Sequence, residues 1–204
     1  MAKERDPLGP HWEALAAADL ADVARRSLCE IDPKGRGCLI QFLDRRYLVN
    51  PSQRAIQPAD PDDTLRVNFE VGLVLLVYLA YAKDEPPTGK WISEKNLPTG
   101  ELFFRGLHAL PMGVLAECFG DRPESLVEAA RRIGGREVLG PADVTLELRP
   151  LPRVPVRIQF WARDDEFDAH ATILFDASVE QQLALDAIGA MVGRLVKHLC
   201  RCVM

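Results

Sequence analysis

Residues 163–170 form the densest group of chemically active side chains in the sequence. Carboxylates and an imidazole can together bind a divalent cation, and on an extended chain Asp168 and His170 point to the same side. The spacing matches no calcium loop and no zinc motif, and an acidic hairpin turn accounts for it equally well. We keep Asp168 and His170 as candidate metal ligands and Asp165 as a candidate ligand-binding residue.

A second group lies near the C-terminal end, where His198 is followed by Cys200 and Cys202. Thiolates and imidazole are the ligands of zinc, copper and iron–sulfur centres. Two cysteines in a C-x-C arrangement supply at most half of a usual four-ligand site, and the sequence has no C-x-x-C elsewhere. The three residues are candidate metal ligands, and the alternative is a plain helix end with incidental thiols.

Arg105 and His108 are spaced to share one face of a helix, where the two side chains could bind an anion together. His108 also precedes Met112, and such a pair can ligate a haem iron. The alternative is a surface or core histidine. Gly189 and Gly193 form a G-x-x-x-G pattern, which in a water-soluble protein mainly indicates close packing. We find no nucleophile elbow and no phosphate loop, so nothing local favours an enzyme.

The elements that must position these residues follow from hydrophobic periodicity. An apolar stripe predicts a first helix over 11–30, and an apolar run predicts a buried helix over 65–83, capped by Asp63 or Thr64. Ser178 and Gln181 have capping-box spacing and predict a last helix over 179–199. Strands are expected at 37–43, 47–50, 90–93, 144–148, 154–162 and 171–175, three short helices between 101 and 134, and a surface connection at 51–64.

Strands and helices are largely segregated, so we predict one α+β domain over 1–204. An antiparallel or mixed sheet should pack against a buried central helix and a long C-terminal helix. The net charge of −5 and the lack of a basic stripe argue against nucleic acid. The apolar run is shorter than the roughly 18–20 residues that cross a membrane. With an odd number of cysteines and no secretion signal, we expect a cytoplasmic protein.

The sequence also resembles a family of uncharacterised proteins, a domain of unknown function found largely in anaerobic bacteria and archaea. The resemblance covers about residues 65–197 and rests on six short motifs: GKWIS at 89–93, LPTG at 97–100, FFRG at 103–106, PRVP at 152–155, DEF at 165–167 and LFD at 174–176. His108 and Pro111 follow closely after FFRG. Some members are fused to iron–sulfur cluster domains, whereas this chain has no cluster-binding cysteine array.

The resemblance implies a role beside anaerobic redox or one-carbon metabolism, with a tetrapyrrole or divalent metal as the ligand. Trp91, Arg105, His108 and Asp176 lie within or close to its motifs and become candidate ligand-binding residues. We rank three hypotheses: an accessory module that binds a cofactor or metal-containing ligand, a module that docks an iron–sulfur or other redox protein, and a hydrolase with a metal on Asp165, Asp168 and His170.

Overall fold

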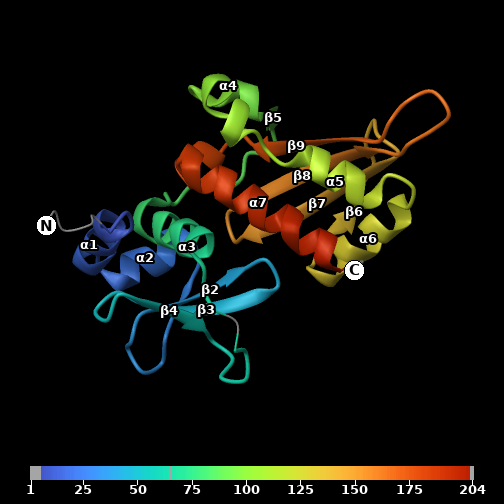
Figure 1. Ribbon diagram of the computed structural model, residues 1–204. Coiled ribbons are helices and arrows are strands. Elements are labelled where there is room, and N and C mark those ends of the chain that lie inside the picture. The colour runs from blue at the N-terminus through green and yellow to red at the C-terminus, as the bar shows by residue number, and fades with distance from the viewer. Residues whose placement is uncertain (1–5, 65, 203–204) are drawn as a thin grey trace, which may run out of the picture.

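The computed structural model describes residues 6–64 and 66–202, which form two antiparallel sheets and the helices around them (Figure 1). The smaller sheet is a meander in chain order. Each of its strands pairs with the next, because short turns such as that at Asp44 join them. Its members are β1 (Glu30–Ile31), β2 (Cys38–Phe42), β3 (Arg45–Asn50) and β4 (Ala55–Pro58).

The larger sheet has the order β5-β9-β8-β7-β6 and is half-buried. Along β8, Val156, Ile158 and Phe160 are buried, whereas the side chains between them are partly exposed, as expected for a sheet with one face in the core. Its strands are β5 (Trp91–Ser93), β6 (Arg136–Glu137), β7 (Val144–Leu151), β8 (Val154–Trp161) and β9 (His170–Asp176).

Helices cover the inner face of this sheet and fill the space between the two sheets. In Figure 1, α5, α6 and α7 lie on one side of the larger sheet, and α3 stands beside α7. The helices are α1 (Gly9–Ala17), α2 (Leu20–Ser27), α3 (Phe69–Tyr81), α4 (Gly100–Phe103), α5 (Met112–Phe119), α6 (Pro123–Arg132) and α7 (Leu185–Arg201).

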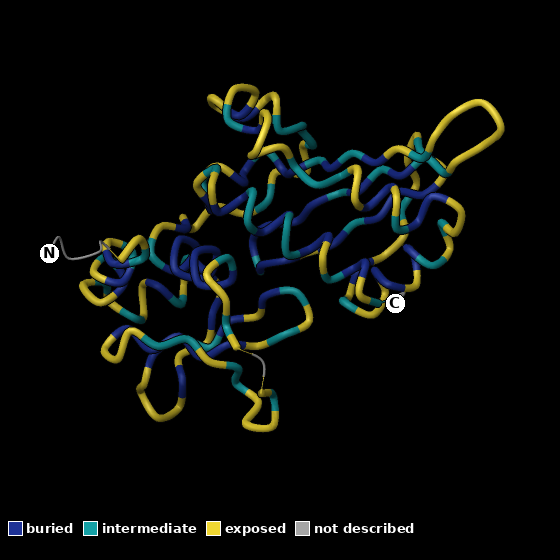
Figure 2. Tube along the Cα trace, viewed as in Figure 1, coloured by how far each residue is buried: buried dark blue, intermediate teal, exposed yellow. Residues whose placement is uncertain are grey.

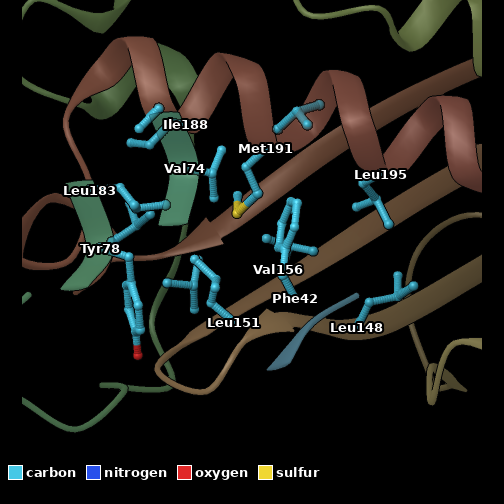
Figure 3. Close-up of a cluster of buried hydrophobic side chains, with 14 of the residues drawn as sticks. Phe42, Val74, Tyr78, Leu148, Leu151, Val156, Leu183, Ile188, Met191 and Leu195 are labelled. Atoms are coloured by element: carbon cyan, nitrogen blue, oxygen red, sulfur yellow. The ribbon is translucent and has the colours of Figure 1, made fainter. Parts of the chain in front are cut away.

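The core sits where α3 and α7 meet the larger sheet. Figure 3 shows Val74 of α3 beside Met191 of α7, above Val156 of β8, and Tyr78 of α3 near Leu151 of β7. Residues 71–79 of α3 are all buried, since this helix is surrounded on every side. Because no face of this helix meets water, its sequence has no regularly spaced polar residues.

One buried hydroxyl joins three parts of this core. The Oη of Tyr78 on α3 donates to the carbonyl oxygen of Ser27 at 2.8 Å and accepts from the amide of Arg153 at 3.2 Å. Burial raises the pKa of Tyr78, so the hydroxyl keeps its proton. The end of α2, the middle of α3 and the β7–β8 turn are therefore held to one another by a fully neutral group.

The predicted class is confirmed: the protein is α+β, with antiparallel sheets, a buried central helix and a long C-terminal helix. The prediction of a single first helix over 11–30 was wrong, because the structure has two helices there. Ala18 is extended, and the Asp19 side chain then accepts from the Ala21 amide at 3.0 Å, which starts a new helix. The apolar stripe runs through both helices because both pack on the core, so periodicity alone cannot reveal the break.

Three further expectations are corrected. The segment 51–64 is more than a connection, because β4 within it pairs with β3. The last helix starts at Leu185, and Ser178 does not cap it, since its hydroxyl donates to Asp176 at 2.7 Å. The cap of α3 is Asn68, whose Oδ1 accepts from the Val71 amide, in place of Asp63 or Thr64. In the described chain, every helix is too short or too polar to cross a membrane.

Candidate functional site

The acidic segment 163–170 is the turn between β8 and β9, and it extends away from the body of the molecule (Figure 2). Asp164 closes the turn by accepting from the amides of Glu166 and Phe167 at 2.9 and 2.7 Å. Asp168 is 94% exposed and pairs with Arg163 at 3.4 Å. Asp165 is exposed on the same turn. The carboxylates thus build a solvated hairpin turn.

His170 at the end of this turn stacks on Trp161, its cross-strand partner, with ring centroids 5.6 Å apart. Across residues 6–64 and 66–202, no group of three or more histidine, cysteine, aspartate or glutamate side chains is arranged to hold a metal ion. The donor set predicted from Asp165, Asp168 and His170 therefore does not fit a resident divalent metal.

Asp176 is 1% exposed, and its hydrogen bonds hold residues 88–89 and Ser178 against the end of β9. Its carboxylate accepts from the Thr88 amide and hydroxyl at 2.9 and 3.0 Å, from the Gly89 amide at 2.6 Å, and from the Ser178 amide and hydroxyl at 2.9 and 2.7 Å. Burial opposes ionisation of Asp176, but these donors outweigh it and hold its pKa below the usual value. Its lone pairs are used by the fold itself.

Trp91 and Arg105 also have partners within the chain. The guanidinium of Arg157 lies 4.3 Å from the centroid of the Trp91 ring, a cation–π contact on the outer face of the larger sheet. Arg105 pairs with Glu101 across one helical turn and is 61% exposed. Arg105 precedes a short 3-10 turn, Gly106–His108, and does not line the hollow that His108 lines.

His108 does line a hollow. Its ring stacks on Phe103, with centroids 5.0 Å apart, at the edge of a groove of about 450 Å³. We call this hollow the apolar groove. It is bounded by the start of α3, by the segment 103–111 and by one face of α7, with the lining Phe69, Glu70, Leu73, Phe103, Leu107, His108, Ala109, Leu110, Pro111, Asp186, Gly189, Ala190, Gly193 and Lys197.

The floor of the apolar groove is a stripe of small residues on α7. Gly189 is within 3.4 Å of Phe104, measured from where its Cβ would stand, so its packing partner lies within the chain. Gly193 has no atom within 4 Å of that position and faces open space. A glycine inside a helix costs about 1 kcal/mol relative to alanine, and no internal packing offsets that cost at Gly193.

The walls of the groove carry large apolar side chains that meet water. Leu107 is fully exposed and Phe69 is 54% exposed. Polar groups are few: His108 at one edge, Asp186 near the start of α7, and Lys197, whose ammonium bonds Glu70 at 3.0 and 3.2 Å. An apolar hollow with a few polar groups at its edge is the usual form of a binding site for an organic ligand.

The geometry of α7 separates Cys200 from the other two C-terminal candidates, His198 and Cys202. His198 and Cys202 lie one turn apart and line a second hollow of about 220 Å³, where the His198 Nε2 is 3.3 Å from the Asp44 Oδ2. Cys200 lies on another face of α7, because two residues span about 200° of a helix. Burial and the adjacent Cys118 thiol raise the pKa of Cys200 to about 12. The C-x-C pair therefore does not form a joint chelate.

Comparison with protein families gives one match, over residues 19–198, to the domain of unknown function DUF3786. The chain belongs to this family. The match includes β1–β9, α2–α6 and most of α7, so the apolar groove lies within the family domain, whereas the second hollow is also lined by Arg201 and Cys202 beyond it. Neither the curated proteins nor the solved structures gave a match.

Sequence reasoning missed most of the groove. Phe69, Glu70, Leu107 and Lys197 were not singled out, because none of them has an unusual neighbour in the sequence. The one available signal was the G-x-x-x-G pattern, which was interpreted as internal packing. That interpretation fits Gly189 but gives no reason for Gly193.

Proposed function

We propose that this protein is a non-catalytic accessory module that binds an organic cofactor or similar ligand in the apolar groove. The observation that carries the proposal is the open, small-residue floor at Gly193 between exposed apolar walls. A ligand with a flat or elongated apolar body would lie on this floor and contact Phe69 and Leu107 on either side. Burial of those side chains would supply most of the binding free energy.

The edge of the groove can bond a polar or acidic group of a ligand, although Lys197 is shared with Glu70 and Asp186 lies nearby. Lys197 supplies an ammonium beside the apolar floor, and His108 supplies an imidazole. The family resemblance adds a tetrapyrrole as one ligand of this type, in a cytoplasmic anaerobic redox or one-carbon setting. His108 is the side chain that would approach a metal carried by such a ring, since imidazole is a common axial ligand.

The test begins with protein purified without oxygen, examined by ultraviolet–visible spectroscopy, elemental analysis and native mass spectrometry. A retained chromophore or a stoichiometric extra mass supports the proposal. For ligand-free protein, thermal melts with a panel of tetrapyrroles and other apolar carboxylic acids follow, because a ligand selective for the folded state raises its stability. No shift with any member of the panel, together with no retained mass, contradicts it.

A single substitution localises the effect. The Cβ that Gly193→Leu adds has no atom within 4 Å, so the variant should fold with its new side chain occupying the groove. We expect it to lose ligand-induced stabilisation. Gly113→Leu is the matched control, since Gly113 is also a helical glycine with nothing within 4 Å of its missing Cβ, on α5 outside the groove. Equal loss in both variants would contradict the assignment.

A second candidate function is docking of a protein, and full exposure of Leu107 favours it. An apolar side chain beside a groove is typical of an interaction surface. The resemblance would make the partner an iron–sulfur or other redox protein. If the groove docks a protein, Leu107→Glu should abolish capture of a specific partner in pull-downs, and the unsubstituted protein should show no stabilisation by the small-ligand panel. The metal-dependent hydrolase gains no support, since Asp165 and Asp168 are exposed on the β8–β9 turn.

A further inference from the structure

The second hollow lies beside α7, next to the β2–β3 turn and the first turn of α3. We call it the arginine-lined cavity. Its volume is about 220 Å³, roughly that of seven liquid waters, which suits a small polar molecule better than an organic cofactor. The polar side chains around it come from two separate segments: Asp44, Arg45, Tyr47, Arg194, His198 and Arg201.

Positive charge exceeds negative charge around this cavity. Three guanidinium groups line it, and the one lining carboxylate, Asp44, lies 3.3 Å from His198 and 4.0 Å from Arg45. Arg45 also bonds Asp63 at 2.6 Å. Arg201 joins from the last turn of α7. Asp63 and Glu70, which do not line the cavity, pair with Arg45 and Arg194, so among the described residues Arg201 is the lining guanidinium without a carboxylate within 4.0 Å, and its charge favours an anion in the cavity.

Arg194 is the most deeply placed of the three. Its side chain is 13% exposed, and one of its terminal nitrogens lies 3.6 Å from Glu70. Its Nε is buried and has no hydrogen-bond partner in the described part of the chain. A buried donor without an acceptor costs free energy, so Arg194 is held at this place by its packing and by Glu70 rather than by a full set of hydrogen bonds.

The titration of His198 is consistent with this charge balance. Burial lowers its pKa most, and the positive charges of Arg45, Arg194 and Arg201 act in the same direction, against the opposing effect of Asp44. Three arginines from two elements therefore act on one imidazole at the same place. The electrostatic potential there favours an anion.

We propose that the arginine-lined cavity binds a small oxyanion, namely a phosphate group, either free or as the ester head of a small metabolite. Guanidinium groups donate pairs of parallel hydrogen bonds to such oxygens, and the Tyr47 hydroxyl adds another donor. The oxyanion bonds the guanidinium groups that line the cavity and offsets their positive charge. This site is separate from the apolar groove, so it goes beyond the proposed function.

The experiment is isothermal titration calorimetry in low-salt buffer free of other oxyanions, with inorganic phosphate and, in parallel, glycerol phosphate. We expect saturable, one-to-one binding. Arg45→Gln and Arg201→Gln should each weaken it at least about tenfold, since each removes a charged donor. Both positions are at least partly exposed, so these variants should fold, whereas Arg194→Gln is a less safe test.

Arg105→Gln is the matched control, because Arg105 is an exposed arginine outside the cavity. Tighter binding of glycerol phosphate than of phosphate identifies an esterified ligand, and equal or weaker binding identifies free phosphate. Absence of binding by both compounds at millimolar concentration would overturn the proposal. So would an equal loss of affinity in Arg105→Gln, which would mean that the anions bind to surface charge in general.

Discussion

The Lys197 ammonium donates to both carboxylate oxygens of Glu70, at 3.0 and 3.2 Å. This pair joins the last helix to the first turn of α3. The same carboxylate also lies 3.6 Å from a terminal nitrogen of Arg194, which precedes Lys197 by three residues on α7. Lys197 lines the apolar groove and Arg194 lines the arginine-lined cavity, so Glu70 forms part of the wall between the two hollows.

Glu70→Gln should strengthen phosphate binding in the arginine-lined cavity. The substitution keeps the shape of the side chain and removes the negative charge that competes for Arg194. Because the pair is partly exposed, we expect an effect of about twofold to fivefold. Calorimetric titration with phosphate measures it. Glu101→Gln, which removes the partner of Arg105 elsewhere, is the control and should change nothing. Weaker binding in Glu70→Gln would contradict the shared wall.

Asp176→Asn should destabilise the fold by about 2–4 kcal/mol. The amide nitrogen of asparagine would face backbone donors that now bond a carboxylate, which leaves buried donors without acceptors. Urea unfolding measures the difference. Asp165→Asn, on the exposed turn, should cost less than about 0.5 kcal/mol. If the two variants were equally stable, the fastening role of Asp176 would be wrong.

Stability should fall on mild acidification because of His198. Its pKa is lowered in the folded state, so the unfolded chain takes up a proton first as the pH drops below about 6.5. The contribution is present above that value and is lost as the pH falls toward the folded pKa. Urea unfolding at pH 7.5 and 5.5 tests this. In His198→Gln the loss should be smaller, and an unchanged loss would assign it to other groups.

Tyr78→Phe should cost about 1–3 kcal/mol. It leaves the Ser27 carbonyl oxygen and the Arg153 amide, both buried, without the hydroxyl that now bonds them. Tyr81→Phe on the same helix is the control, since Tyr81 is 48% exposed and its hydroxyl bonds His11 near the surface. Similar stabilities for the two variants would show that the buried hydroxyl does not hold the three segments together.

Local patterns predicted most of the elements but few of the contacts between them. The apolar run of α3, the hairpin around Asp44 and the strands of the larger sheet follow from periodicity and turn residues. The break at Ala18 and Asp19 was missed because both helices bury the same stripe. β4 was missed because proline and aspartate on both sides of it indicated a loop.

The candidate sites divide in the same way. His108 and His198 were singled out for their chemistry, and both line a hollow. Their neighbours Arg45 and Glu70 come from distant parts of the chain, and no spacing rule relates them to α7. From the sequence, the Asp176 carboxylate could either bind a ligand or accept hydrogen bonds from the protein itself. Only the tertiary structure shows that its donors are groups of the chain, such as the Gly89 amide.

The burial of α3 on every side has a consequence for how the protein is made. During synthesis α3 leaves the ribosome roughly a hundred residues before α7, against which it packs, and well before β7 and β8. Until then its nine consecutive apolar or neutral residues at 71–79 have no lasting cover. The nascent chain therefore exposes this apolar segment for about half of its translation, which is the condition under which chaperones bind an unfinished chain.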